Sequence, residues 1–159
     1  MSHDQHAHFM REAIRLAQRN MDSLQGGPFG AVIVRDGKII STGVNQVTSH
    51  NDPTAHAEVV AIRNACAQIG HWDLHACEIY TSCEPCPMCL GAIWWARLHR
   101  IWYAANQEQA AQAGFDDARF YDELALPAHA RTISMHNILP EEGKLVLHAW
   151  QDKQDKIPY

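Results

Sequence analysis

Two short motifs contain the side chains of this sequence that could hold a metal ion. Cys86 and Cys89 are separated by two residues, and Pro87 between them is tolerated only in the first turn of a helix. Both thiols therefore lie on one side of a helix start, which is a chelating arrangement. His56 and Glu58 are two residues apart, so on a helix they share a neighbour only beyond its N-terminus. The spacing predicts that two helix N-termini converge on one metal ion.

One imidazole and two thiolates are ligands typical of zinc, and they leave the fourth position of a tetrahedral site open for water. An open position is typical of a catalytic site, whereas structural sites have four protein ligands. Glu58 is then placed to move the protons of that water. We therefore predict one Zn²⁺ per subunit, held by His56, Cys86 and Cys89, with Glu58 as the catalytic proton shuttle.

A third thiol, Cys83, leaves a second interpretation open. Together with His56, Cys86 and Cys89 it could close the site and make the zinc purely structural. That arrangement leaves Glu58 without a role, and Cys83 also suits a small buried residue at the end of a strand. A disulfide framework is disfavoured because the chain has five cysteines, an odd number, and is long enough to fold without cross-links.

The composition narrows the class of protein. The chain has 159 residues and a formal net charge of −5, with 13 Lys and Arg against 18 Asp and Glu. We expect a single domain over 1–159 that buries its own core. The acidic balance counts against a nucleic-acid substrate, since proteins that grip a polyanion usually carry a basic surplus. No apolar run approaches the ~18 residues that span a bilayer, and the start of the chain lacks signal-peptide features, so we expect a cytoplasmic protein without membrane contact.

Hydrophobic periodicity predicts the elements that must position these residues. Strands alternate with helices, which is typical of an α/β fold with parallel crossovers and with helices on both faces of the sheet. An Asp36-Gly37 turn marks a hairpin near the start. The predicted elements are a helix over 8–24, strands over 31–34 and 39–44, a helix over 56–69, a strand over 77–81, a buried helix over 85–96, a strand over 100–105, helices over 107–113 and 118–126, a fifth strand over 131–137 and a last helix over 141–156.

Two further candidate residues, Phe29 and Asn45, precede the first metal-binding helix in the sequence. Phe29 is the one large side chain of a glycine-rich loop, where it could plug the core or form a wall on which a flat ring stacks. Asn45 follows a strand directly, where its carboxamide could form a turn or contact the edge of a base.

Asp52 or Thr54 is predicted to cap the helix over 56–69, and Gly70 is predicted to end it.

The motif H-x-E followed by P-C-x-x-C is typical of zinc-dependent nucleobase deaminases, and this chain matches both halves in full. On these residues the sequence resembles the cytidine deaminase superfamily. Within that superfamily it is most similar to the bacterial guanine deaminases, because the likeness runs over nearly the whole chain. The stretches that carry it are GGPFGAVIV (26–34), NDPTAHAE (51–58), YTSCEPCPMCLGAI (80–93), YAA (103–105), AGFDD (113–117) and the terminal Tyr159.

The resemblance implies a three-layer α/β/α sandwich with a five-stranded mixed sheet. It also implies a homodimer in which the C-terminal segment can cross to the neighbouring subunit and complete its site. Without the resemblance, Asp117 would be interpreted as a helix cap and Tyr159 as a frayed end. The substrate-binding residues that it implies are Asn45 on the purine edge, Phe29 and Trp95 around the ring, Ala57, and Asp117 with Tyr159 on the far side of the base.

The leading hypothesis is hydrolytic deamination of a free purine base, guanine foremost, to xanthine and ammonia by a zinc-bound hydroxide. Deamination of adenosine or cytosine in tRNA would use the same metal ligands, but the acidic balance and the AGFDD stretch count against it. A binding module stabilised by zinc, without chemistry, would require the closed site that includes Cys83. The expected partners are a small purine and a second copy of the chain, without nucleic acid.

Overall fold

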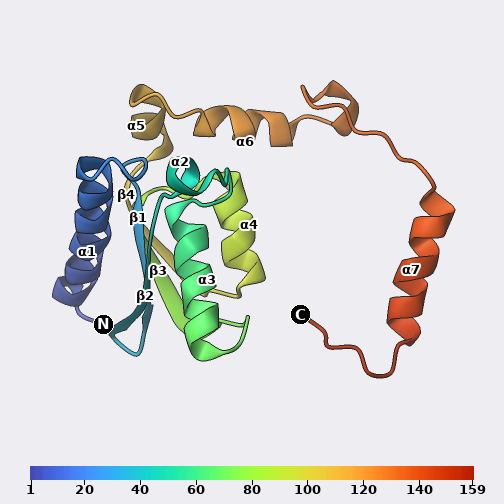
Figure 1. Cartoon of the computed structure of the whole chain (residues 1–159), viewed down its shortest axis with the longest axis horizontal. Coiled ribbons are helices and arrows are strands. Elements are labelled where there is room, and N and C mark those ends of the chain that lie inside the picture. Colours follow the sequence, from blue (N-terminus) through green and yellow to red (C-terminus); the bar gives the residue numbers. More distant parts are fainter. The chain divides into compact units, whose positions relative to one another are not determined.

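The computed structural model describes residues 1–159 and divides them into two compact units, Met1–Tyr121 and Asp122–Tyr159. The first unit contains the whole sheet and every predicted metal ligand (Figure 1). Its elements are α1 (His3–Asp22), β1 (Gly30–Arg35), β2 (Lys38–Val44), α2 (Val47–His50), α3 (Ala57–Ile69), β3 (Cys77–Cys83), α4 (Pro87–Trp95), β4 (Arg100–Ala105) and α5 (Gln107–Gln112). Helix α6 (Asp117–Ala125) crosses the boundary, and the second unit adds a 3₁₀ turn (Ala128–Ala130) and α7 (Pro140–Asp152).

The sheet has the strand order β2-β1-β3-β4. Strand β1 pairs antiparallel with β2 and β3, and β3 pairs parallel with β4, so the sheet is mixed as predicted. The predicted hairpin turn is confirmed, because Asp36 and Gly37 both have positive φ, 51° and 71°. Helices α3 and α4 are the crossovers that lead into β3 and β4.

The sheet has four strands, so the prediction of a fifth over 131–137 is wrong. The alternation of this segment is real, but a strand forms only where another strand offers backbone partners. Here the segment is held by local side-chain contacts instead. Arg131 donates to the carbonyls of Leu124 and Leu126, and the backbone and hydroxyl of Thr132 donate to Glu123.

The first unit is a three-layer α/β/α sandwich, with α1 on one face of the sheet and α3 and α4 on the other (Figure 1). The alternation of side chains along each strand builds both cores. The cluster under α1 contains Phe9, Ala13, Val32, Val34 and Tyr80, and the cluster under α3 and α4 contains Ala31, Ile33, Ala57, Ala61, Ile79 and Ile93.

Helix α3 lies very close to strand β2, because Gly43 has no side chain. A Cβ atom added at Gly43 would collide with the carbonyl of Ala57 and the backbone nitrogen of Ala61. Only glycine permits this approach of two backbones. The contact fixes the first turn of α3, next to His56 and Glu58, against the sheet.

Helix α1 begins at His3, five residues earlier than predicted. Ser2 and Gln5 form a capping box at its start. His6 then places Nδ1 2.6 Å from the hydroxyl of Tyr80, a contact between residues 74 positions apart. The longer helix thus has both a local cap and a tertiary contact at its start.

Helix α4 is apolar on nearly all sides, but the prediction that it is buried is wrong. Only Cys89 and Ile93 are buried within it. Met88, Trp94 and Trp95 lie on the outer side and are exposed, Trp94 by 67%. The first unit therefore presents an apolar helix face at its surface.

The second unit has no buried residue. Its helix α7 carries several large apolar side chains, and all of them are exposed: Leu145, Val146, Leu147 and Trp150. No helix of the chain has the length and apolar character needed to cross a membrane.

Candidate active site

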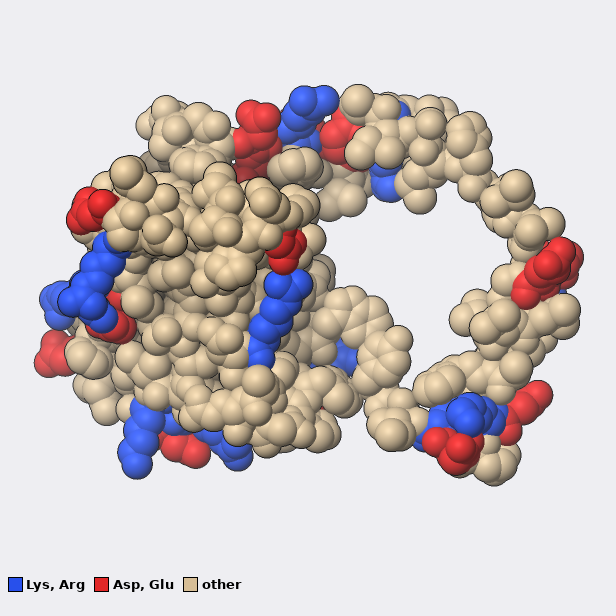
Figure 2. All heavy atoms as spheres, viewed as in Figure 1, with Lys and Arg blue, Asp and Glu red and all other residues tan.

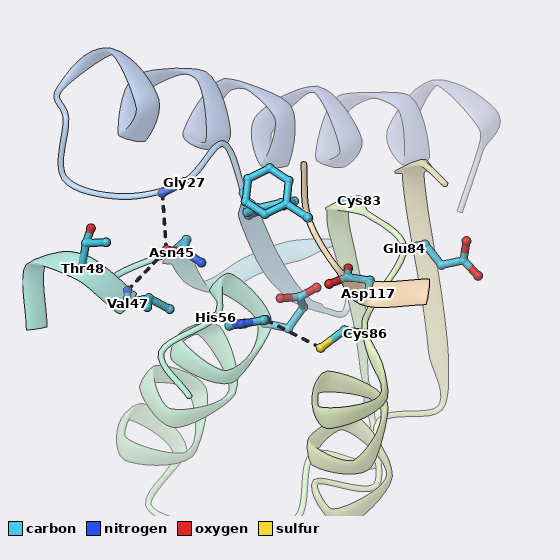
Figure 3. Close-up of a pocket in the computed structure, with 12 residues that line it drawn as sticks. Gly27, Asn45, Val47, Thr48, His56, Cys83, Glu84, Cys86 and Asp117 are labelled. Atoms are coloured by element: carbon cyan, nitrogen blue, oxygen red, sulfur yellow. Dashed lines mark hydrogen bonds between the residues drawn. The ribbon is translucent and has the colours of Figure 1, made fainter. Parts of the chain in front are cut away.

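The two predicted metal-binding motifs meet at the starts of α3 and α4 (Figure 3). His56 is the N-cap of α3, and Cys86 is the N-cap of α4 with Pro87 directly after it. The predicted convergence of two helix N-termini is confirmed. The prediction of Asp52 or Thr54 as the cap is wrong, because Asp52 Oδ1 accepts from the backbone nitrogen and hydroxyl of Thr54 and shapes the preceding loop.

The three ligand atoms already have the spacing of a tetrahedral zinc site. Cys86 Sγ lies 3.7 Å from His56 Nδ1 and 3.6 Å from Cys89 Sγ, and Cys89 Sγ lies 3.5 Å from His56 Nδ1. Zinc bonds of ~2.3 Å to sulfur and ~2.0 Å to nitrogen at tetrahedral angles place ligand atoms about 3.5 to 3.8 Å apart. The residues therefore fit zinc in both chemistry and geometry, and they form the cluster that could hold a metal.

A hydrogen bond between the two thiols moves their pKa values in opposite directions. Cys89 donates to Cys86 Sγ, and this hydrogen bond lowers the pKa of Cys86 to about 4 while it raises the pKa of Cys89. The same thiolate raises the pKa of His56 through its hydrogen bond to the ring. A divalent cation would replace these protons, since zinc binds the thiolate form.

Glu58 is the buried carboxylate next to this cluster. It is 6% exposed, and burial raises its pKa. Its Oε2 lies 3.4 Å from Cys89 Sγ, and its Oε1 accepts a hydrogen bond of 3.1 Å from the hydroxyl of Thr81. A carboxylate with a raised pKa beside a metal centre is suited to taking up and returning protons.

A cavity of about 320 Å³ opens onto His56, Cys86 and Glu58 (Figure 3). Two rings form one of its walls, because Phe29 and Phe115 lie edge to face with their centroids 4.6 Å apart. The volume is within the range of small-molecule sites. The lining residues are Gly27, Phe29, Asn45, Val47, Thr48, His56, Glu58, Cys83, Glu84, Cys86, Phe115 and Asp117.

Asn45 is oriented by two backbone donors. Its Oδ1 accepts from the backbone nitrogens of Gly27 at 3.4 Å and Val47 at 3.3 Å (Figure 3). This arrangement leaves the NH₂ group as the part of the amide that can donate to a ligand in the cavity. Buried Asn20 of α1 supports the same corner, because its Nδ2 donates to the carbonyls of Gly27 and Asn45.

The structure brings three of the predicted substrate residues together in the cavity: Asn45, Phe29 and Asp117. Burial raises the pKa of Asp117. Ala57 is fully buried at the start of α3 and does not line the cavity, and Trp95 is 60% exposed and does not line it either. Tyr159 is the last residue of the second unit and is 70% exposed. The substrate contacts of these residues stay predictions.

Cys83 lines the cavity but does not belong to the ligand cluster. It is buried at the end of β3, and burial raises its pKa to about 11. A thiol of this kind is protonated at neutral pH and behaves as a small apolar group. The position agrees with the interpretation of Cys83 as a buried strand residue.

Sequence reasoning missed several residues of the site, among them Phe115, Thr81 and Asn20. Phe115 was visible within the AGFDD stretch but was not assigned to the ring wall. Thr81 and Asn20 gave no signal, because their partners are 23 and 25 positions away along the chain.

Comparison with known proteins supports the assignment of the cluster. Residues 3–105 match the family described as the cytidine and deoxycytidylate deaminase zinc-binding region, and this range contains His56, Cys86 and Cys89. The chain belongs to this family. Its members are zinc enzymes, so the cluster is the expected place for the metal.

Several relatives extend beyond the zinc-binding region. The guanine deaminase of Bacillus subtilis (strain 168) is 51% identical over 154 residues, which are 97% of this chain and 99% of that protein. An X-ray structure of guanine deaminase from Bacillus subtilis covers 100% of this chain and 99% of its own, with 50% identity and a TM-score of 0.93. The structure of NE0047 in complex with 2,6-diaminopurine is 29% identical over 95% of this chain and 83% of its own, with a TM-score of 0.66.

The family also includes enzymes that act on RNA. The tRNA-specific adenosine deaminase of Aquifex aeolicus (strain VF5) is 40% identical over 134 residues, which are 84% of this chain and 76% of that protein. The alignment with this enzyme covers less of the chain than the alignment with the guanine deaminase, 84% against 97%.

Proposed function

We propose that this chain hydrolyses the exocyclic amino group of guanine and releases xanthine and ammonia. One observation carries the proposal: a cavity of about 320 Å³ opens onto a His, Cys, Cys cluster with zinc geometry and onto a buried glutamate. The guanine deaminase of Bacillus subtilis, with its 97% coverage of this chain, gives the substrate class.

His56, Cys86 and Cys89 would hold the zinc, which would supply the Lewis acidity that makes a water nucleophilic near neutral pH. Glu58 takes a proton from that water as oxygen adds to the ring carbon that bears the amino group. Glu58 then gives this proton to the neighbouring ring nitrogen, takes the second proton from the newly added hydroxyl group and gives it to the departing amine. The carbon–nitrogen bond breaks, a carbonyl forms, and ammonia leaves.

The cavity has the groups needed to orient a flat, polar ring. Phe29 and Phe115 offer apolar surface to a ring face, and Asn45 presents amide donors to an acceptor such as an oxo group. Asp117 faces the same cavity and can accept from ring N–H groups when it is ionised. The oxo group of guanine can accept a hydrogen bond from the Asn45 amide. An amino group at the same position would place a second donor against it.

A free base is a better match to this surface than an RNA. The net charge is −5. On the face that Figure 2 shows, basic and acidic side chains are scattered over the first unit and form no continuous basic patch. Proteins that bind RNA neutralise several phosphates and usually carry such a patch. Deamination of tRNA is therefore the alternative outcome of the substrate screen described below.

The proposal includes a homodimer in which the C-terminal segment completes a neighbouring site. Two exposed apolar surfaces support it: the outer side of α4, with Met88, Trp94 and Trp95, and the apolar residues of α7. Large exposed apolar patches mark protein contacts. Trp95 then belongs to the subunit contact, and Tyr159 reaches the base from the partner subunit. All five cysteines are free, which agrees with a reducing compartment such as the cytoplasm.

A substrate screen tests the proposal. The zinc-loaded protein is incubated with free bases, nucleosides and tRNA, and released ammonia is measured. We expect ammonia from guanine in equal amount to xanthine. Ammonia from tRNA or adenosine, with none from guanine, would assign the site to the other branch of the family.

A further inference from the structure

Thr81 contacts the catalytic carboxylate without lining the cavity. Its hydroxyl donates to Glu58 Oε1 over 3.1 Å, and Thr81 is 1% exposed. It is not among the residues that surround the space for the substrate. Thr81 can therefore influence the reaction only through Glu58.

The sheet fixes the direction of the Thr81 side chain. Side chains alternate along β3, so Thr81 is on the same side as Ile79, which packs in the cluster under α3, and opposite to Tyr80, which packs under α1. The backbone of Thr81 is paired on both sides, with Ala31 of β1 and Tyr103 of β4. The hydroxyl is thus held by a central strand rather than by a loop.

The two oxygens of Glu58 have different surroundings. Oε1 is held by the Thr81 hydroxyl, which can donate only one hydrogen bond. Oε2 lies on the side of the metal ligands, 3.4 Å from Cys89 Sγ. Rotation of the carboxylate would exchange the two oxygens and break the hydrogen bond to Thr81.

We infer that Thr81 is a positioning residue that fixes the carboxylate of Glu58 so that Oε2 alone carries the protons of the reaction. The inference rests on the proposed role of Glu58 in deamination. If the Thr81 hydroxyl had a purely structural role, removal of this hydroxyl would lower the stability of the protein and leave its turnover unchanged.

Two substitutions separate these roles. Thr81→Val keeps the shape and the strand preference of the side chain but removes the donor, whereas Thr81→Ser keeps the donor and is the matched control. Loss of a hydrogen bond to a charged group predicts that Thr81→Val lowers kcat for guanine about 10- to 100-fold. We expect KM, zinc content and Tm close to those of the wild type. Thr81→Ser is expected to retain kcat within about threefold.

Crystal structures of the zinc-loaded variants give a readout that does not depend on turnover. Oε2 of Glu58 should keep its place beside Cys89 in Thr81→Ser and lose it in Thr81→Val. Wild-type kcat in Thr81→Val, equal losses in both variants, or loss of zinc from Thr81→Val would each overturn the inference. If the wild type releases no ammonia from guanine, the proposed function fails, and the orientation of Glu58 in the crystals still decides whether Thr81 positions it.

Discussion

Glu58 and Tyr159 are both predicted to act on the same substrate, yet the chain holds them in opposite ways. Glu58 is 6% exposed, contacts Thr81 and lies next to the ligand Cys89. Tyr159 is 70% exposed at the end of a unit without any buried residue. The predicted catalytic carboxylate is thus held in place by its neighbours in the sandwich, whereas the large apolar side chains of the C-terminal segment are exposed.

The largest expected effect is at Glu58. Glu58→Gln keeps the volume of the side chain but cannot carry a proton, and each proton transfer assisted by a general acid or base is typically worth about 10²- to 10⁴-fold. We expect guanine turnover to fall by at least about 10²-fold while zinc content stays at that of the wild type. Steady-state assays and metal analysis of the same preparation check this. Turnover within about tenfold of the wild type would remove Glu58 from the mechanism.

The second comparison is within the three neighbouring thiols. Cys86→Ser and Cys89→Ser should lose most of the bound zinc, because serine replaces a ligand. Cys83→Ser is the matched control and should keep near-unit stoichiometry, since Cys83 lies outside the ligand cluster. Metal analysis of the three purified variants decides. Equal loss from Cys83→Ser would favour the closed, structural zinc site.

The structure brings the residues of these two predictions close together, for a local reason. His56, Glu58, Cys86 and Cys89 lie in short motifs whose geometry follows from helix starts, so their spacing alone predicts the cluster. The hairpin turn at Asp36 and the helix end at Gly70 are equally local, and both are confirmed.

Most of the missed features depend on contacts between distant parts of the chain. The early start of α1 has a local signal in the capping box of Ser2 and Gln5, and the distant contact of His6 with Tyr80 adds to it. The alternation over 131–137 is strand-like, but the sheet offers it no partner. The apolar composition of α4 predicts burial, and only the packing of the unit shows that Trp94 and Trp95 face outward.

A third prediction removes the end of the segment. Deletion of residues 157–159 should leave Tm and zinc content almost unchanged, because Ile157 and Tyr159 are 77% and 70% exposed. Guanine turnover should fall by at least about tenfold, since the ring of Tyr159 no longer closes over the base. Ile157→Ala, which keeps Tyr159, is the control and should retain activity. A truncated enzyme as fast as the wild type would show that Tyr159 is a frayed end.

A smaller effect distinguishes a segment that acts on its own subunit from one that acts on the partner. Glu58→Gln with an intact C-terminus is unfolded and refolded together with the truncated chain that keeps Glu58. If the segment serves the partner, hybrid dimers contain one complete site, and random pairing of equal amounts restores about a quarter of wild-type turnover. Each variant refolded alone gives the baseline. A mixture no more active than the sum of its parts would contradict the exchange.

The central claim is that zinc on His56, Cys86 and Cys89 drives the deamination of guanine. The most direct measurement follows xanthine formation by the purified protein after the zinc is stripped with a chelator, and then during titration with Zn²⁺. We expect turnover to disappear with the metal and to return linearly, reaching a plateau at about one equivalent per chain, because the cluster holds a single ion. Full turnover by the zinc-free protein would contradict the account. So would a protein that binds one equivalent of Zn²⁺ and still forms no xanthine.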